Sequence, residues 1–174
     1  MKKLTLPLSA TDVAELRAGD CVLLSGTIFT ARDCAHRRIF ELLDADMPLP
    51  FSLEGAFIYY AGPCPAPAGK ASGSCGPTTS ARMNAFAPRL LDLGLGGMIG
   101  KGEMSEETRL AIMRNKSVYF AAIGGAGASY GNAIKRSEFI AFPELLSEAI
   151  YRLEVAGFPL VVAIDSNGKS IYER

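Results

Sequence analysis

Apolar segments with strand character alternate along this chain with segments that carry apolar residues at helical spacing. The clearest strand covers residues 21–30, a mostly apolar, β-prone run that follows a Gly-Asp turn. A helix is expected directly after it, over about residues 32–43, with Ile39 and Leu43 on its apolar face. Because strands and helices alternate in this way, the sequence predicts an α/β fold with a mixed central sheet flanked by helices.

The other expected elements are bounded by glycine-rich turns, prolines or capping residues. The predicted strands cover residues 3–8, 56–60, 97–100, 117–123, 158–164 and 170–172, the last two forming a hairpin around Asn167-Gly168. The predicted helices cover about 11–16, 77–94, 106–114 and 144–155, with Thr11 and Ser105 as N-caps. With no internal repeat and no clear linker, residues 1–174 are expected to form one domain.

The charge balance limits the partners that this chain can have. Lys and Arg total 18, as do Asp and Glu, so the formal net charge is zero. A surface for nucleic acid or for an anionic membrane needs an excess of basic residues. The basic start of the chain is not followed by a long apolar run, so neither a secretory signal nor a membrane span is expected. The composition predicts a cytoplasmic protein without nucleic-acid or membrane partners.

The four cysteines, Cys21, Cys34, Cys64 and Cys75, are far apart in the sequence and form no C-x-x-C pair. This spacing is poor for a zinc site or for an iron–sulfur cluster. Disulfides are not expected in a reducing compartment. We therefore expect four free thiols, with Cys21 in the core, and no metal site formed by this chain alone.

Residues 73–83 combine a glycine-rich turn with a helix-start signal. Pro77 suits the first position of a helix, and the hydroxyls of Thr78, Thr79 and Ser80 surround backbone N–H groups that lack an intrahelical partner. Such a helix end attracts anions, and Arg82, one turn further on, adds a guanidinium suited to a carboxylate or phosphate. The segment indicates an anion site, and the alternative is an ordinary capped helix with Arg82 solvated on its outer face.

A second group of candidates lies where strand 21–30 becomes a helix. Arg32 and His36, the only histidine, are four residues apart and share a helix face. Arg32 is a second candidate cation, and His36 is a candidate proton donor or hydrogen-bond support. Asp33 and Thr79 are further candidates for a supporting role. The alternative is that Arg32 and Asp33 are surface residues and that His36 is a satisfied, partly buried side chain.

A third cation, Lys101, lies between two glycines that would allow a ligand to approach the backbone closely. Its alternative is an ordinary solvated turn lysine. Together, Arg32, Arg82 and Lys101 would form a receptor for a dicarboxylate. A catalytic carboxylate pair, a Ser/His/Asp set and a metal-ligand cluster are all missing or weak. The chain therefore looks like the substrate-holding half of a site, without its own electrophile.

Several segments, in a consistent order, resemble the C-terminal domain or β subunit of class I, iron–sulfur fumarases and tartrate dehydratases. The segments that carry this resemblance are residues 19–26, 30–37, 73–83, 98–102, 121–127 and 148–159. The resemblance implies a swivelling β/β/α domain that works with a larger α subunit. In this family the α subunit's cysteines hold a [4Fe-4S] cluster whose unligated iron acts as a Lewis acid. A hetero-oligomer is implied, with α2β2 as a candidate assembly.

The resemblance also implies an activity and assigns roles to residues. The chain would be the β subunit of a hydro-lyase that reversibly hydrates fumarate to malate, with L-tartrate as the alternative substrate. Thr78 would remove or return the proton at the carbon next to a carboxylate, while Arg32, Arg82 and Lys101 would bind the two carboxylates. Gly76 would be small because substrate and backbone approach closely there.

Asn84 departs from the family pattern, which usually places Asp after Arg-Met. In place of that Asp, Asn84 is expected to weaken a supporting contact to Arg82, so this change bears on the substrate or on activity. A hypothesis from a different functional class is a stand-alone dicarboxylate-binding domain that has kept the cations and has no activity of its own.

Overall fold

Within residues 1–173, which the computed structural model describes, seven strands form one mixed sheet. The strands are β1 (Lys2–Thr5), β2 (Cys21–Thr30), β3 (Phe57–Tyr59), β4 (Gly97–Gly100), β5 (Val118–Ala121), β6 (Ile134–Ala141) and β7 (Ile150–Ile164). The helices are α1 (Ala10–Glu15), α2 (Asp33–Asp44), α3 (Ala87–Asp92), α4 (Glu106–Arg114) and α5 (Gly127–Ala133), with 3-10 helices η1 (Ser80–Met83) and η2 (Pro143–Glu148). None of the helices in this part of the chain is long and apolar enough to cross a membrane.

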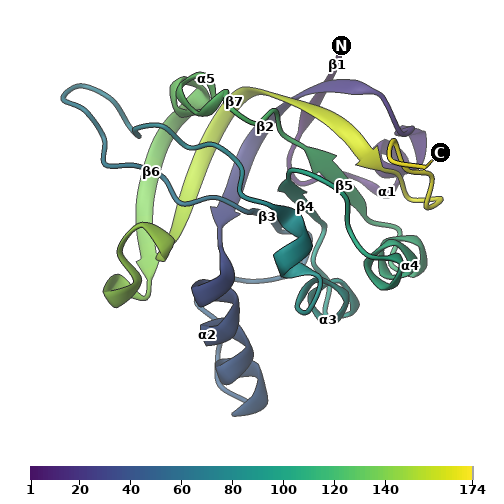
Figure 1. Cartoon of the computed structure of the whole chain (residues 1–174), viewed down its shortest axis with the longest axis horizontal. Helices are drawn as coiled ribbons and strands as arrows, with labels where there is room; N and C mark the ends of the chain where they lie inside the picture. Colours follow the sequence, from purple (N-terminus) through teal and green to yellow (C-terminus); the bar gives the residue numbers. More distant parts are fainter. Residues whose placement is uncertain (174) are drawn as a thin grey trace.

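The sheet closes on itself through five of its strands. Strands β2, β3, β4 and β5 are neighbours and run parallel, whereas β7 pairs antiparallel with both β5 and β2. β1 extends the sheet beside β2, and β6 extends it beside β7. Figure 1 shows β7 as the long curved strand that links the two sides, with α3 and α4 below the parallel strands. The α/β architecture with a mixed sheet and flanking helices confirms the prediction.

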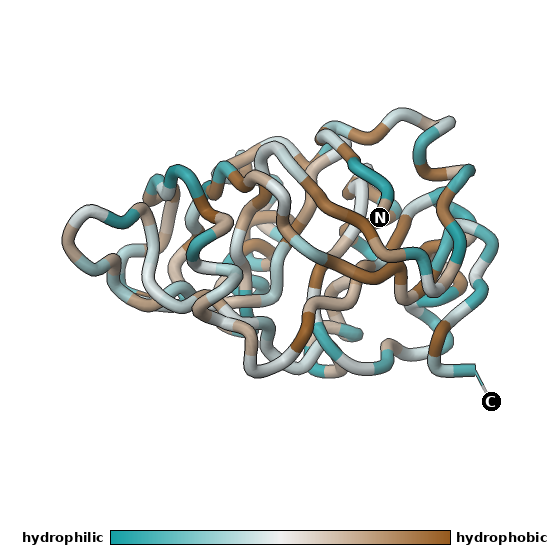
Figure 2. Tube along the Cα trace, turned by 90° about the horizontal axis from the view of Figure 1, so that it is seen from above, coloured by the Kyte–Doolittle hydropathy of each residue, from teal (hydrophilic) through white to brown (hydrophobic). Residues whose placement is uncertain are grey.

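The two faces of the sheet build two apolar clusters. In β3, Phe57 and Tyr59 face one cluster with β2, β7 and α5, whereas Ile58 faces the other cluster with α2, α3 and α4. This division follows from the two-residue period of a strand, which sends neighbouring side chains to opposite faces. In Figure 2 the hydrophobic stretches lie mainly in the wider half of the molecule. The packing of these two clusters therefore fixes the positions of the strand ends, and the candidate site residues follow directly after those ends.

The continuous helix predicted over residues 77–94 is wrong. The Thr78 N–H donates to Tyr60 O at 2.7 Å, and the Ser80 N–H donates to Lys101 O at 2.9 Å. These bonds hold the backbone against the ends of neighbouring strands, so Pro77 does not start a helix. The chain instead forms η1 and then a separate helix, α3, with a proline in its first turn.

The helix predicted over residues 144–155 is also wrong, because residues from Ile150 onward belong to β7. Leu153 and Val155 are buried in alternation with more exposed neighbours, which is a strand period. Only η2 covers the start of the predicted segment. The neighbouring strand β6 and helix α5 were not predicted; β6 is a mostly exposed edge strand without a continuous apolar run.

Most other predicted elements agree with the structure within a few residues, but the strand predicted over residues 158–164 is only the last part of β7, which begins at Ile150. β2 coincides with the predicted strand 21–30, and Ser105 caps α4 by accepting a hydrogen bond from the Thr108 N–H. α1 is present, but its N-cap is Ser9 and not Thr11, because Ser9 and Asp12 form a reciprocal capping box.

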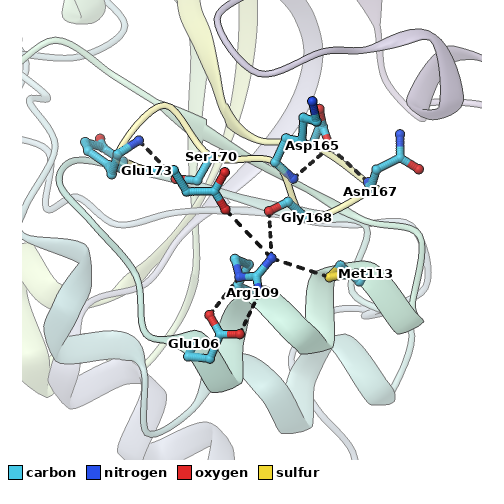
Figure 3. A network of polar contacts seen from close by, with 10 residues as sticks. Glu106, Arg109, Met113, Asp165, Asn167, Gly168, Ser170 and Glu173 are labelled. Atoms are coloured by element: carbon cyan, nitrogen blue, oxygen red, sulfur yellow. Dashed lines mark hydrogen bonds and ion pairs between the residues drawn. The ribbon is translucent and has the colours of Figure 1, made fainter.

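The predicted turn around Asn167-Gly168 is present, although residues 170–172 contribute only one bridge, Ser170 to Ile164. Figure 3 shows how this turn is attached to α4: the Arg109 guanidinium donates to Gly168 O at 3.0 Å. The Asp165 carboxylate in turn accepts from the Asn167 N–H at 2.9 Å. These contacts fix the end of β7 against the helical side of the sheet.

Tyr130 on α5 provides a test of this architecture. Its hydroxyl accepts from the Ile123 N–H and donates to Pro159 O, both at 2.8 Å, and so joins the turn after β5 to β7. Tyr130→Phe leaves both partners unsatisfied and should lower the free energy of unfolding by about 1–3 kcal/mol. Tyr151→Phe, at a ring that packs edge to face against the exposed Phe139, is the control and should change it by less than about 0.5 kcal/mol. Urea unfolding measures both, and equal effects would contradict the assigned role of Tyr130.

Candidate active site

The predicted site residues follow the carboxyl ends of neighbouring parallel strands. Arg32 follows β2, Thr78 follows β3 after a long loop, and Lys101 directly follows β4. Because these strands are parallel, their carboxyl ends meet at one edge of the sheet, where ligands commonly bind in α/β proteins. The long loop between β3 and η1 extends beyond β6 in Figure 1 and returns to this edge.

Thr78 and Arg82 are in direct contact. The Arg82 Nη2 donates to Thr78 Oγ1 at 2.7 Å, and the same nitrogen lies 3.6 Å from Asp33 Oδ2. The Arg82 side chain is 51% exposed and the Asp33 side chain 21%, so this group lies at an open surface. A guanidinium that donates to a hydroxyl oxygen favours negative charge on that oxygen. The arrangement can therefore assist proton transfer at Thr78.

Lys101 is held by the backbone of the segment that carries Thr78. The Lys101 N–H donates to Ser80 Oγ at 2.9 Å, and Thr79 pairs with Lys101 as an isolated parallel bridge. The Ser80 hydroxyl lies 2.8 Å from the Tyr119 hydroxyl, which donates its proton to Gly102 O, also at 2.8 Å. A Cβ added at Gly124, after β5, would lie 3.9 Å from Lys101 Nζ, so the ammonium reaches toward that turn. Lys101 thus lies at the same edge as Thr78 and is anchored through Ser80.

Gly76 lies where the backbone of residues 73–79 meets the turn before α5. The Cys75 N–H donates to Gly127 O at 3.0 Å. A Cβ on Gly76 would lie 3.4 Å from the Gly127 Cα, which is a tight contact. The segment at Gly76 therefore approaches the backbone of Gly127. The close approach of Gly76 to a substrate stays a prediction.

Arg32 occupies the N-cap position of α2 and pairs with an acidic residue from a distant segment. Its Nε lies 3.8 Å from the Glu148 Oε1, at the end of η2. The Arg32 side chain is 30% exposed, so part of it reaches the open edge. Arg32 thus contacts Glu148, and Arg82 contacts Asp33, the residue after Arg32. Both arginines therefore lie at the start of α2.

His36 is fully buried one turn below Arg32. Its Nδ1 lies 2.8 Å from Arg32 O, and its ring stacks on Phe86 with centroids 5.1 Å apart. Burial lowers the pKa of His36 to about 4, an effect that the hydrogen bond to Arg32 O only partly offsets. The imidazole is therefore neutral at physiological pH, which favours hydrogen-bond support of the Arg32 backbone over proton donation.

The Asn84 side chain is directed to the start of α4, so its expected effect on Arg82 does not arise from a direct hydrogen bond. Its side-chain oxygen instead accepts from the Ser105 N–H at 2.9 Å and from Thr108 Oγ1 at 3.0 Å. Asn84 thus fixes the start of α4, a task that an amide oxygen performs as well as a carboxylate oxygen. The contacts made at this position are therefore compatible with either Asn or Asp.

The thiols of this chain do not fit an iron–sulfur cluster. The structure describes all four cysteines as free, and no group of three or more His, Cys, Asp or Glu residues within residues 1–173 is placed to hold a metal ion. Cys75 is buried, and desolvation raises the pKa of its thiol to about 12, which opposes the thiolate that a cluster needs. Cys21 was predicted in the core and is exposed, because it stands at the first, open end of β2.

Sequence reasoning missed Tyr119 and Glu148 as members of the site, and it placed the Ser80 hydroxyl at a helix start instead of beside Lys101. Ser80 lies inside the motif 73–83, but its link to Lys101 depends on the pairing of that segment with the end of β4. Glu148 was expected within a helix, and only the actual path of η2 and β7 brings it to Arg32.

Comparison with known proteins identifies the family. Residues 2–174 match the family model described as the fumarase C-terminus. The chain belongs to this family. It is 42% identical over 173 residues to the putative L(+)-tartrate dehydratase subunit beta of Methanocaldococcus jannaschii, covering 96% of this chain and 89% of that protein. It is 34% identical over 177 residues to the L(+)-tartrate dehydratase subunit beta of Escherichia coli, covering 98% and 87%.

Other members of the fumarase C-terminus family are much longer. The chain is 40% identical over 154 residues to the anaerobic class I fumarate hydratase of Escherichia coli, covering 87% of this chain and only 28% of that protein. The names of these relatives are those of hydro-lyases. The resemblance to class I fumarases and tartrate dehydratases that the motifs predicted is thus confirmed.

The buried His36 generates a prediction about stability. Its folded-state pKa of about 4 lies below the ordinary value of 6.5, so between these pH values the unfolded chain binds more protons than the folded chain. The contribution of the neutral His36 to the free energy of unfolding is therefore at its maximum above pH 6.5. It falls by about 3 kcal/mol as the pH approaches 4. Urea unfolding at closely spaced pH values measures this slope.

His36→Phe is the matched variant for this test, since it keeps an aromatic ring beside Phe86 and removes the titrating group. Because His36 is the only histidine, the slope between pH 6.5 and 5 should largely disappear in this variant. A variant that retained the wild-type slope would show that another group controls it.

Proposed function

We propose that this chain is the β subunit of a hydro-lyase that reversibly hydrates fumarate to malate. Thr78 is the proton-transferring group, and Arg32, Arg82 and Lys101 bind the two carboxylates. The observation that carries the proposal is the 2.7 Å hydrogen bond from Arg82 to Thr78 Oγ1, at the strand edge that also carries Lys101. A free threonine hydroxyl is a weak base, and this contact supplies the activation that it needs.

The proposed proton transfer follows from the direction of that hydrogen bond. In dehydration, Thr78 acts in its alkoxide form: Oγ1 takes the proton from the carbon next to one carboxylate and becomes a neutral hydroxyl, while hydroxide leaves from the neighbouring carbon. The Arg82 guanidinium stabilises negative charge on Thr78 Oγ1, because a charge-assisted hydrogen bond strengthens as that charge develops. Hydration reverses these steps, with Thr78 returning the proton. Asp33, 3.6 Å from Arg82, keeps the guanidinium in place.

The proposed enzyme needs a second subunit. The thiols here do not fit a cluster, so the α subunit would hold the [4Fe-4S] cluster that the family resemblance implies. When bound, that cluster supplies a Lewis acid for a carboxylate and hydroxyl of the substrate. The assembly is proposed to be a cytoplasmic hetero-oligomer, for example α2β2, in which this chain is a swivelling domain that closes its open edge against the α subunit.

L-tartrate is the second candidate substrate. Two relatives that this chain covers almost from end to end are named as β subunits of tartrate dehydratases, which favours it. Both substrates are four-carbon dicarboxylates, and both would use the same cations.

Anaerobic co-expression with a cluster-carrying α chain tests the proposal. Hydration and dehydration are then assayed on fumarate, malate and L-tartrate, for the pair and for this chain alone. Turnover by the pair but not by the single chain is expected, and the substrate turned over fastest identifies the reaction. An assembled, cluster-loaded pair that turns over none of these substrates contradicts the proposal and indicates another hydroxy-acid substrate or a degenerate site. A chain that does not associate with the α chain at all favours a stand-alone dicarboxylate-binding domain.

Single substitutions at Thr78 and Arg82 separate their two roles. Thr78→Ala should lower kcat by at least about 100-fold with little change in KM, because general acid–base catalysis contributes about 10²–10⁴-fold. Arg82→Ala should lower kcat and also raise KM, because both the hydroxyl and a substrate carboxylate lose a charged donor. Arg89→Ala, at an exposed arginine paired with Asp44, is the control and should behave like the wild type. Steady-state kinetics of the assembled pair distinguishes these patterns.

A further inference from the structure

Glu148 is an acidic residue that the proposed function leaves without a role, although it lies against a substrate-binding arginine. Glu148 Oε1 and Arg32 Nε are 3.8 Å apart, and both atoms are buried without a hydrogen-bond partner among the described residues. Two opposite charges at this distance attract strongly where water is largely excluded. A carboxylate beside the Nε edge of a guanidinium leaves the edge formed by its two Nη groups for a second carboxylate.

The stem of Arg32 lies in a narrow space between two segments. A Cβ added at Gly62 would lie 3.4 Å from Arg32 Cδ and 2.7 Å from Ser147 O. The backbone of η2 and the chain after β3 therefore enclose the aliphatic part of Arg32, and a side chain at residue 62 would not fit between them. This packing restricts the rotamers of Arg32 and brings Glu148, the residue after Ser147, to its Nε.

The buried Thr30 hydroxyl links the backbone segment that carries Arg32 to the segment that carries Glu148. Thr30 Oγ1 accepts from the Tyr151 N–H at 3.1 Å and donates to Ala149 O at 3.4 Å. Thr30 is fully buried and precedes Arg32 by two residues, while Ala149 directly follows Glu148. The separation of the two charged residues is therefore set by the pairing of β2 with β7 and does not depend on flexible surface contacts.

We propose that Glu148 is a positioning residue that aims the Arg32 guanidinium at the substrate and thereby selects a four-carbon dicarboxylate. The inference rests on the proposed function, since it assigns Arg32 to one substrate carboxylate. Fixing the Nη edge of Arg32 relative to Arg82 and Lys101 sets the spacing at which a second carboxylate is accepted. Without the Glu148 charge, the Arg32 guanidinium can rotate about its terminal bonds. It then adapts to ligands with a different spacing of carboxylates and no longer discriminates between them.

The kinetic test compares Glu148→Gln with Glu144→Gln in the assembled enzyme. Both residues lie on η2, but Glu144 pairs with Arg38 on the outer face of α2 and is the matched control. Glu148→Gln should raise the KM for fumarate about tenfold, the size of one weakened charge-assisted contact, and change kcat by less than about threefold. The preference in kcat/KM for fumarate over its monoamide should fall by a similar factor. Glu144→Gln should change neither quantity.

A second measurement does not depend on turnover. In the full chain labelled with ¹⁵N-arginine, the Nε–H resonance of Arg32, assigned through Arg32→Lys, should shift in Glu148→Gln and not in Glu144→Gln. Thermal unfolding of each variant checks that the fold is retained.

The outcomes separate this inference from the proposed function. An active wild-type pair in which Glu148→Gln matches Glu144→Gln in KM and in substrate preference overturns the role of Glu148 and leaves the proposed function intact. A wild-type pair that turns over no dicarboxylate overturns the proposed function. In that case the Nε–H resonance alone decides whether Glu148 positions Arg32, and an unchanged resonance overturns this inference as well.

Discussion

The antiparallel pairing of β2 with β7 is the constraint on which the rest of the molecule depends. It runs from Cys21 opposite Val161 to Phe29 opposite Arg152 and closes the five strands β2, β3, β4, β5 and β7 into a ring. Since β7 also pairs with β5, the four parallel strands are held at both sides. Their carboxyl ends consequently open at one edge, and the segments that follow them have little freedom in where they place their side chains. The buried Thr30 hydroxyl extends this pairing to the start of the site.

The sequence predicts the local parts of the fold better than those that depend on distant partners. Strand 21–30 and the helix capped by Ser105 follow from nearby residues alone, and both are present. The helix expected after Pro77 fails because Thr78 and Ser80 donate to carbonyls of other segments, which no local pattern reveals. Residues 144–155 contain many helix-forming residues, but pairing with two neighbouring strands outweighs that propensity.

The candidate site shows the same difference between features that follow from local sequence and features that depend on distant partners. Arg32, Thr78, Arg82 and Lys101 could be named from motifs, because each follows a strand and a turn that local sequence marks. Their pairing could not be predicted: Asp33 contacts Arg82, Glu148 contacts Arg32, and Ser80 anchors the turn that carries Lys101. His36 illustrates a partial success, since support of Arg32 was one of the roles considered, whereas the complete burial that keeps its ring neutral depends on Phe86 and Tyr60 from other segments.

The exposure of Arg82 has a consequence for how ligand and partner affect one another. A guanidinium that is half in water gains only about 0–1 kcal/mol from an ion pair, because solvent screens the charges. Covering the edge with another protein surface removes that water and makes the same contact several times stronger. In the proposed enzyme, dicarboxylate binding and subunit docking at this edge would therefore be thermodynamically linked, each strengthening the other by the same factor. The single chain would then hold its ligand weakly until the complex forms, so its affinity for a small dianion would report on the state of that complex.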